Sequence, residues 1–340
     1  MKKGTNAGII LFFIVLAALY IAIYAVPNVA GFFDVTYVAE YGELSVYDET
    51  DAWFIRNETV YTAPDGGSVR RLADEGDLLR KGTQVVAITA GAPGEDSEEM
   101  DQVRERLGGQ VQKTTMMQGS GLISYFVDGY EGTLTPDYAL TCGYDLLSEI
   151  REDQVVKIPS VSTREGDPVF KSIKNDRWYL IIFVPEDHAS RYRVGKTCYL
   201  VPPDDEGHDM GEVQLRVESV DMDGEQAKVV MSSRNYFDRI GELRCMKVKV
   251  ITSEHSGLLV RNSSIVEKDG KTGVYIKDTT GKYVFVRVNV LDSDDEQSVV
   301  SASSFYDEEG EYVYTIDPFE DVLSDPSIQE EEGDEDVDQG

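Results

Sequence analysis

The chain has 340 residues, 41% hydrophobic and 28% charged, which is enough apolar side chain for two or three folded domains. It carries 63 acidic and 32 basic residues, a formal net charge of −31. This excess of carboxylates argues against nucleic acid as a ligand, because binding to phosphates depends on Lys and Arg. It also disfavours contact of the folded part with an anionic membrane surface.

The N-terminal region contains a long apolar segment. No charged residue occurs from Gly4 to Phe33, and Ala7–Val26 is long enough to cross a hydrocarbon core of about 30 Å as a helix. A cleaved signal peptide has a shorter apolar region and small residues at its cut site, so it fits less well. Because Lys2 and Lys3 precede the segment and carboxylates follow it, the N-terminus is predicted to be cytoplasmic. We therefore expect a single-pass protein of the cell membrane whose bulk, after Phe33, lies outside the cytoplasm.

Most of the remaining chain alternates between apolar and polar residues with turn residues between the segments, which is typical of β-strands. The clearest such segments are Val35–Asp48, Arg177–Pro185, Gly211–Ser233, Met246–Ser253 and Gly281–Leu291. The sequences DMDGEQ and EKDGKTG predict hairpin turns with Asp-Gly at the tip. Helical signals are confined to Ser97–Gly109, with a Ser cap and a terminal Gly pair, and to one or two short helices in Thr135–Asp153. The predicted fold class is mainly β and multidomain.

The C-terminal segment is strongly acidic. From Asp317 onward there are eleven carboxylates and no Lys or Arg. A segment of this composition buries too little apolar surface to fold. Residues 316–340 are therefore predicted to be a disordered acidic tail.

The side chains suited to chemistry form no convincing site. Three cysteines without a CxxC pair favour small buried hydrophobes over a zinc site or a disulfide framework; whether any two of Cys142, Cys198 and Cys245 form a disulfide stays open. The acidic turns Pro202–Asp209 and Leu291–Ser298 contain oxygen ligands for a hard cation, but solvated loops are the favoured interpretation. No catalytic triad or metalloprotease spacing involves a histidine. We predict no catalytic residue, no metal ligand and no enzymatic activity.

An internal repeat begins in the segment APDGGSVRRLADEGDLLRKG. Its Glu-Gly-Asp corner at Glu75–Asp77 recurs at Glu165–Asp167, each time beside a short strand. Gly76 and Gly82 stand where the chain must reverse sharply, and only glycine enters positive φ freely. Two such halves are expected to interlock into a small flattened barrel.

These halves resemble those of biotinyl and lipoyl carrier domains, which join them through a tight hairpin that bears the modified lysine. The first half here ends at Val85–Gly91 and is followed by a longer insertion without a Met-Lys-Met tip. The nearest lysines, Lys113 within the insertion and Lys81 before a strand-ending glycine, do not occupy such a tip. The resemblance therefore implies the scaffold without a bound cofactor.

A split lipoyl-like unit behind one N-terminal anchor resembles the HlyD-like periplasmic adaptor proteins, also called membrane fusion proteins. The segment GDPVFKSIKNDRWYLIIFVPEDHASRYRVGKTCYLV resembles the family's passage from the second lipoyl half into its β-barrel. HSGLLVRNSSIVEKDGKTGVYIKD resembles its membrane-proximal segment, with Arg261 where the family pattern has proline. The resemblance covers roughly Val35 to Val300 and departs in one respect. The insertion at about 92–118 leaves room for only a much shortened helical hairpin, because ten helical residues rise about 15 Å.

The resemblance implies an out-and-back path in which Val35–Asn57 pairs with strands from Met246–Ser304. The implied parts are a cytoplasmic stub and anchor (1–33), a membrane-proximal β domain (34–58 with 247–315), a lipoyl-like domain (59–91 with 119–173), a β-barrel (174–246) and the tail (316–340). Residues 92–118 and 130–163 are insertions in the lipoyl-like domain. Tyr130, Tyr138 and Tyr144 on the second insertion are candidates for a partner-contact patch, with packing onto the protein's own barrel as the favoured alternative.

The resemblance implies a non-catalytic adaptor that forms homo-oligomers and couples an inner-membrane transporter to export of a small molecule or polypeptide. The short insertion implies a partner close to the membrane. A cell-envelope scaffold that recruits cell-wall or division proteins, without a role in transport, is the alternative.

Overall fold

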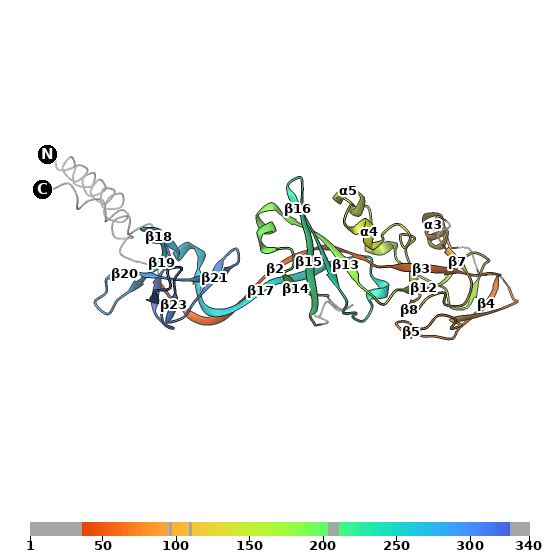
Figure 1. Cartoon of the computed structure of the whole chain (residues 1–340), viewed down its shortest axis with the longest axis horizontal. Helices are drawn as coiled ribbons and strands as arrows, with labels where there is room; N and C mark the ends of the chain where they lie inside the picture. The colour runs from red at the N-terminus through yellow and green to blue at the C-terminus, as the bar shows by residue number, and fades with distance from the viewer. Residues whose placement is uncertain (1–35, 93, 95–96, 109–110, 203–210, 327–340) are drawn as a thin grey trace, which may run out of the picture. The chain divides into compact units, whose positions relative to one another are not determined.

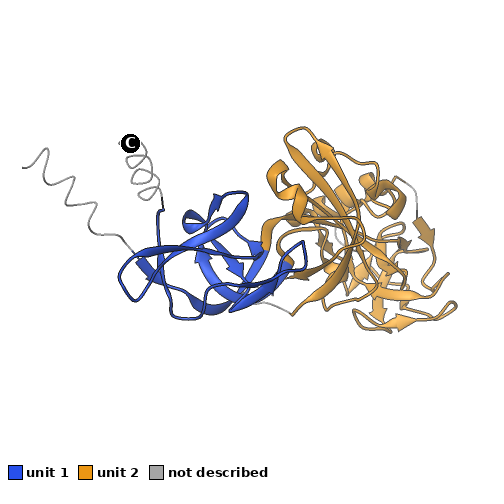
Figure 2. Cartoon of the chain, turned by 60° about the vertical axis from the view of Figure 1, so that its left-hand side comes forward, with its two compact units in different colours: residues 1–46, 253–340 blue, residues 47–252 orange. Residues whose placement is uncertain are grey.

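The computed structural model describes residues 36–326 except 93, 95–96, 109–110 and 203–210, and it divides them into two compact units (Figures 1 and 2). One unit contains residues up to Val46 and from Ser253 onward, and the other contains Tyr47–Thr252. The described residues include no helix with the length and apolar character needed to span a membrane. The predicted anchor, Ala7–Val26, lies outside the described residues.

Two small sheets in the Tyr47–Thr252 unit form a barrel-sandwich from the two sequence halves. One sheet has the order β11-β4-β6 and the other β5-β8-β12-β3-β7. Their strands are β3 (Glu58–Thr62), β4 (Gly67–Arg71), β5 (Leu78–Leu79), β6 (Val86–Thr89), β7 (Val111–Lys113), β8 (Gly121–Ser124), β11 (Ser162–Thr163) and β12 (Pro168–Ile173). Because β3 and β4 of the first half pair with β12 and β11 of the second, the halves interlock as predicted.

The repeated Glu-Gly-Asp corner is confirmed in atomic detail. Gly76 and Gly166 have φ of 80° and 87°. In the first corner Asp77 accepts a hydrogen bond from the backbone N–H of Asp74, and in the second Asp167 accepts one from that of Arg164. In each half, therefore, the turn is closed by an Asp side chain that binds the backbone N–H three residues before it, and a strand begins directly after that Asp.

Gly166→Ala is expected to destabilise the protein by about 1–2 kcal/mol, because a Cβ is strained at positive φ even where it meets no neighbour. A Cβ at Gly166 would have no atom within 4 Å, so the backbone is the sole cause. Gly119→Ala is the matched control, since that glycine is equally open and lacks positive φ. Denaturant unfolding of both variants checks this, and equal losses would contradict it.

Six further strands close into an antiparallel β-barrel in the same unit, to which β2 and β17 contribute the parts that lie within Tyr47–Thr252. The order is β14-β15-β16-β13-β2-β17, and β14 also pairs with β17. The strands are β2 (Glu40–Ile55), β13 (Trp178–Pro185), β14 (Thr197–Val201), β15 (Val213–Asp223), β16 (Gln226–Ser233) and β17 (Cys245–Arg261). Their inward side chains, including Trp178 and Phe54, form the largest apolar core. The pairing predicted between the first strand segment and Met246–Ser304 is confirmed, because β2 lies beside β17.

The two insertions cover the barrel-sandwich and the barrel. In the first, α3 (Glu98–Leu107) begins at the Ser97 cap and ends at Gly108 with φ 59°, and it buries Met100, Val103 and Leu107. The described part of this insertion holds this one helix and β7, in place of a hairpin of two helices (Figure 1). The second contains α4 (Pro136–Ala139), α5 (Tyr144–Leu147), η2 (Glu152–Gln154) and β10 (Val156–Lys157), and β10 pairs with β9 (Phe126–Val127) just before the insertion.

The second insertion explains why β13 is an unbroken apolar run. Leu180 and Ile182 point into the barrel core, whereas Ile181 and Phe183 pack under residues of the insertion such as Leu134. A strand covered on both faces needs apolar residues at every position. The short segments η3 (Glu186–Arg191) and η4 (Ile240–Glu242) complete the unit.

Six buried ionic side chains join the barrel-sandwich to the barrel: Arg56, Glu58, Asp128, Glu131, Lys171 and Arg244. Each side chain is at most 1% exposed. Glu58 lies 3.0 Å from Arg56 Nε, 2.9 Å from Lys171 Nζ and 2.5 Å from Arg244 Nη2. Arg244 Nε also donates to Asp128 at 2.5 Å. This cluster, called the ion network below, connects β3, β12 and the loop after β9 to the residue before β17.

The other unit is built on a sheet of order β1-β25-β19-β18, with β20 also paired to β19. Its elements are β1 (Thr36–Val38), η5 (Asn262–Ser264), β18 (Val266–Lys268), β19 (Lys271–Lys277), β20 (Tyr283–Arg287), β21 (Val290–Ser293), β22 (Gln297–Val300), β23 (Ser304–Tyr306), β24 (Tyr312–Tyr314) and β25 (Asp321–Leu323). The Asp-Gly hairpin turns are confirmed, with φ of 69° at both Gly224 and Gly270.

The prediction of a disordered tail from residue 316 is wrong at its start. Strand β25 pairs antiparallel with β1, and Ile316, Val322 and Leu323 are buried. The acidic composition obscured Ile316 and Val322, two apolar side chains that fill the core of this unit beside Ala39 and Val274. Residues 327–340 lie outside the described part of the chain.

Candidate docking surface

The three tyrosines predicted as a contact patch lie on the second insertion, above the outer face of the barrel. Tyr130 and Tyr138 are partly buried and pack against the apolar cluster under the insertion. Tyr144 is 42% exposed, and its ring meets Phe183 edge-on with centroids 4.9 Å apart. These contacts favour packing on the protein's own barrel, so a partner role for these tyrosines stays a prediction.

A more exposed aromatic surface lies on the β23–β24 hairpin. Tyr306, Tyr312 and Tyr314 are 73%, 52% and 78% exposed. Tyr306 of β23 lies directly opposite Tyr312 of β24, and Tyr314 follows Tyr312 by two residues in the same strand. Because side chains alternate between the faces of a strand, the three rings share one face. We call these three side chains the tyrosine face.

The rings of the tyrosine face support one another. The centroids of Tyr306 and Tyr312 are 5.4 Å apart, and those of Tyr312 and Tyr314 are 5.2 Å apart, both in edge-to-face contact. On the other side of the hairpin, Phe305 and Val313 are partly buried. The hairpin therefore anchors one apolar face in its own unit and presents the aromatic face to solvent. Large exposed aromatic surfaces are uncommon unless they bind a partner.

The turn of this hairpin is held by Asp307. One carboxylate oxygen accepts hydrogen bonds from the backbone N–H groups of Glu309 and Glu311, at 3.1 and 2.9 Å. The other accepts one from Arg287 Nη2 at 3.0 Å. The hydrogen bond from Arg287 is the main cause of a lowered pKa of Asp307. The carboxylate thus stays ionised and fixes the spacing of the two tyrosine-bearing strands.

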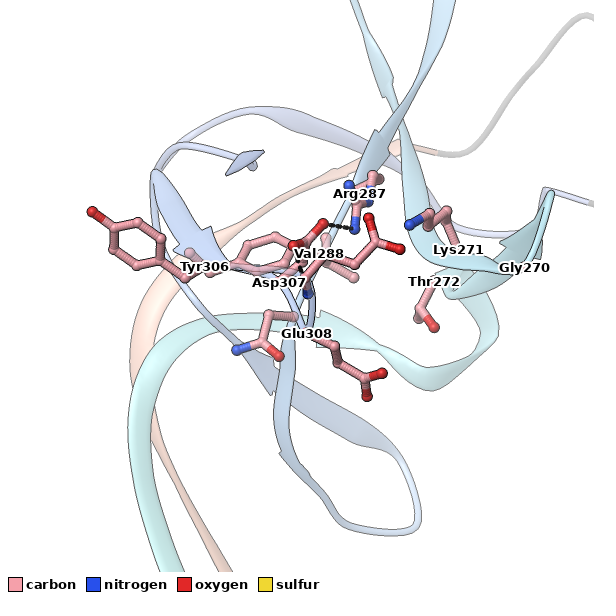
Figure 3. A pocket seen from close by; sticks show the side chains of 11 residues that line it. Gly270, Lys271, Thr272, Arg287, Val288, Tyr306, Asp307 and Glu308 are labelled. Atoms are coloured by element: carbon pink, nitrogen blue, oxygen red, sulfur yellow. Dashed lines mark hydrogen bonds and ion pairs between the residues drawn. The ribbon is translucent and has the colours of Figure 1, made fainter. Parts of the chain in front are cut away.

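A hollow of about 310 Å³ lies beside the hairpin. Figure 3 shows Arg287 directed at Asp307 within it, Lys271 beside Arg287, and the Tyr306 ring projecting away from the other labelled side chains. Acidic residues of the turn, Glu308 and Glu309, complete the rim. The arrangement is polar and shallow, which suits a rim around an aromatic contact better than a small-molecule site.

The remaining candidates of the sequence analysis are dispersed. Lys113 forms an exposed ion pair with Glu165 at 2.5 Å, and Lys81 is exposed. His188 Nδ1 lies 2.5 Å from Asp48 Oδ1, and the Asp48 carboxylate also accepts hydrogen bonds from Arg191 and Tyr192. These contacts connect η3 to β2. The acidic turn Pro202–Asp209 falls almost entirely outside the described residues. Within the part of the chain that the structure describes, no three His, Cys, Asp or Glu side chains gather as a metal site.

The cysteines are buried and unpaired, as three separate thiols. Burial raises the pKa of Cys198 to about 11 and that of Cys245 to about 12. At neutral pH these thiols are protonated and unreactive, because the thiolate is the nucleophile. The interpretation as small buried hydrophobes is confirmed.

The sequence contained a signal for the tyrosine face. In SSFYDEEGEYVYT, aromatic residues flank a Gly-containing acidic turn and alternate with Val313 after it, which is a hairpin pattern. The segment lies just before the acidic tail, and that composition obscured it. Which of the nineteen tyrosines are exposed depends on packing that the alternation alone does not reveal.

Two domain families match the chain in order. The RND-related barrel-sandwich hybrid domain matches residues 58–174, and the RND-related β-barrel domain matches residues 178–254, together more than half of the chain. No curated protein matches the chain.

Several solved structures are similar in part. MacA from Actinobacillus actinomycetemcomitans has 10% identity over 85% of this chain and 99% of its own, with a TM-score of 0.36. ZneB from Cupriavidus metallidurans has 10% identity over 86% and 92%, with a TM-score of 0.26. The membrane fusion protein Spr0693 from Streptococcus pneumoniae R6 has 11% identity over 62% and 98%, with a TM-score of 0.24. Superpositions this weak carry no argument, and the assignment rests on the two domain families. Because a barrel-sandwich hybrid domain is followed along the chain by a β-barrel domain, the chain belongs to the HlyD-like family of adaptor proteins, the membrane fusion proteins.

Proposed function

We propose that this protein is a membrane-anchored adaptor outside the cytoplasm, without catalytic activity, that works with an inner-membrane transporter in efflux or secretion. The family supports the adaptor role. The tyrosine face is the observation that carries the proposal further, because it is an exposed and pre-ordered contact surface. The predicted anchor at Ala7–Val26 precedes the unit that bears this face, which would hold the face near a membrane partner.

The chemistry of the tyrosine face indicates the kind of partner surface it fits. Tyrosine provides a large contact area with little loss of side-chain entropy, and it is enriched at interfaces. The adjoining turn is acidic, with Asp307, Glu308, Glu309 and Glu311. A complementary surface would place apolar groups opposite the rings and Lys or Arg opposite the turn. We propose such a surface on the transporter, and assembly of the adaptor as a homo-oligomer.

The domain organisation belongs to the same proposal. Residues 34–58 with 247–315 would form the membrane-proximal domain, 59–91 with 119–173 the lipoyl-like domain, and 174–246 the β-barrel. The first insertion folds α3 onto the barrel-sandwich through Met100, Val103 and Leu107. A helix used in this way leaves no projecting hairpin in the described residues, which supports a partner close to the membrane.

The test is isolation of the full-length protein in mild detergent, with mass spectrometry of the proteins that accompany it. A transporter subunit should be recovered with the wild type, and at least tenfold less of it with the triple variant Y306S/Y312S/Y314S. Tyr41→Ser is the matched control, since Tyr41 is 64% exposed in β2 of the same unit. Its recovery should equal that of the wild type.

Two outcomes would overturn this proposal in different ways. Recovery of cell-wall synthesis or division proteins without a transporter would replace export by the envelope-scaffold function. Undiminished transporter recovery with the triple variant, as with Tyr41→Ser, would keep the adaptor role and remove the tyrosine face from it.

A further inference from the structure

The ion network contains one carboxylate that is held differently from the others. Glu58 has three cationic groups within 3.0 Å, and Asp128 has the Arg244 guanidinium at 2.5 Å. Among the described residues, Glu131 has a single cationic neighbour within ion-pair distance, Lys171 Nζ at 3.6 Å, and that ammonium lies closer to Glu58. Glu131 is therefore the weakest ion partner in a site that excludes water.

Backbone groups provide the rest of the support for Glu131. Its Oε1 accepts from the N–H of Asp128 at 3.1 Å, and its Oε2 accepts from the N–H of Gly129 at 3.0 Å. Both oxygens are free to accept only while the carboxyl is ionised or while its proton points away from these donors. The state of this carboxyl is thus linked directly to the backbone of its own loop.

The loop that carries Glu131 also contacts the first insertion. A Cβ at Gly129 would lie 2.9 Å from the carbonyl oxygen of Val103 in α3, and 2.5 Å from Arg106 Cβ, so the two backbones are in close contact. The Arg106 guanidinium lies 5.4 Å from the centre of the Tyr130 ring. The loop is therefore held between the ion network on one side and α3 on the other.

We propose that Glu131 gains and loses a proton in the folded protein, and that its protonation state controls how firmly the loop 128–131 is held against the ion network. The charged groups that face it are Asp128 on its own loop, Glu58 of β3, Lys171 of β12 and Arg244 before β17. This regulation does not depend on the proposed transporter partner.

The electrostatics agree with the burial of Glu131 and with its weak ion pairing. Burial, and then the charge of Asp128, raise the pKa of Glu131 to about 7, although Lys171 acts in the opposite direction. The folded state thus binds the proton more tightly than the unfolded chain, whose Glu has its ordinary pKa of 4.5. The added stability is complete below about pH 4.5 and is lost as pH rises through about 7. Acid should hold the loop, and mild alkali should loosen it.

Hydrogen exchange of the full-length protein at pH 6 and pH 8 tests this proposal. After correction for intrinsic exchange rates, the peptide containing residues 126–134 should open about tenfold more often at pH 8, because the protonated fraction of Glu131 in the folded protein falls about tenfold between the two pH values. Glu131→Gln keeps the shape of the protonated carboxyl and should remove the difference. Glu165→Gln, at an exposed carboxylate paired with Lys113, is the matched control and should keep it.

Equal corrected exchange of the wild-type peptide at both pH values would overturn the proposal, and so would a tenfold difference that persists in Glu131→Gln. If Glu131→Gln fails to fold, infrared difference spectra of the wild type decide. A protonated buried carboxyl should be present at pH 6 and absent at pH 8, and its absence at both would refute proton binding. Since neither readout involves a transporter, either result leaves the proposed function standing.

Discussion

Arg244→Ala should destabilise the Tyr47–Thr252 unit by about 3–5 kcal/mol, because it leaves the buried carboxylate of Asp128 without its cation and removes one of the three cations around Glu58. Arg244 donates to Asp128 at 2.5 Å and to Glu58 at 2.5 Å, and its Nη1 donates to the Phe54 carbonyl at 3.0 Å. Burial lowers the pKa of this guanidinium, but the charges of Asp128 and Glu58 outweigh that effect and raise it. Arg244 is thus the cation that contacts both acids.

The same balance determines the state of Glu58. Burial raises its pKa, but Arg244, Arg56 and Lys171 attract the ionised form more strongly, so the pKa falls below its ordinary value. Without Arg244 the ionised form would keep two cations, and Asp128 would keep none at short range. The loss should therefore be concentrated at Asp128, where the residues after β9 join the barrel.

Urea unfolding followed by tryptophan fluorescence measures the effect, because Trp53 and Trp178 both belong to this unit. Arg151→Ala is the control. Its ion pair with Asp153 is 68% and 71% exposed, and such pairs contribute about 0–1 kcal/mol. If Arg244→Ala were no more harmful than Arg151→Ala, the ion network would not be what joins the two domains.

Trp178→Ala should cost about 3–5 kcal/mol, because it opens a cavity in the middle of the β-barrel core. Trp178 is fully buried, and its ring is stacked on Phe54 with centroids 5.9 Å apart. The ring of Phe237 meets the Trp178 ring edge-on, with centroids 6.0 Å apart. The Nε1–H of Trp178 donates a hydrogen bond to the Asn235 carbonyl oxygen at 2.9 Å. The side chain therefore fixes strand β13, strand β2 and the loop after β16 together.

A graded series separates packing from hydrogen bonding. Trp178→Phe keeps an aromatic ring but leaves the Asn235 carbonyl unpaired, so a smaller loss of about 1–3 kcal/mol is expected. Leu140→Ala, at a side chain 54% exposed, should change stability by less than about 0.5 kcal/mol. Fluorescence of Trp53, which is buried in the same unit, reports unfolding in all three variants. Equal losses for Trp178→Ala and Leu140→Ala would show that the barrel core repacks around the missing ring.

Features set by local chemistry could be predicted from the sequence. The Glu-Gly-Asp corners follow from the freedom of glycine at positive φ, and Gly76 and Gly166 occupy it. The ends of α3 follow from the Ser97 side chain and the left-handed Gly108. Alternation along the strands follows from the period of the β-pleat, and the order of the motifs indicated the adaptor family. These features need only neighbouring residues, so the amino-acid order is sufficient.

Which tyrosines are exposed depends on tertiary structure. Tyr306, Tyr312 and Tyr314 are exposed, whereas Tyr130 and Tyr138 are largely covered, although all five lie in similar polar segments. The difference arises because the second insertion packs on the barrel, and the β23–β24 hairpin turns its aromatic face away from its own core.

The ion network could not be predicted from the sequence either. Its six residues are separated by up to 188 positions in the chain, from Arg56 to Arg244, and no periodicity connects them. The tail is a third case, since β25 becomes ordered only by pairing with β1 at the other end of the described chain. Sequence determined the strands, the turns and the family of this protein. Burial, and with it the pKa of Glu131, was decided by which distant segments exclude water from one another.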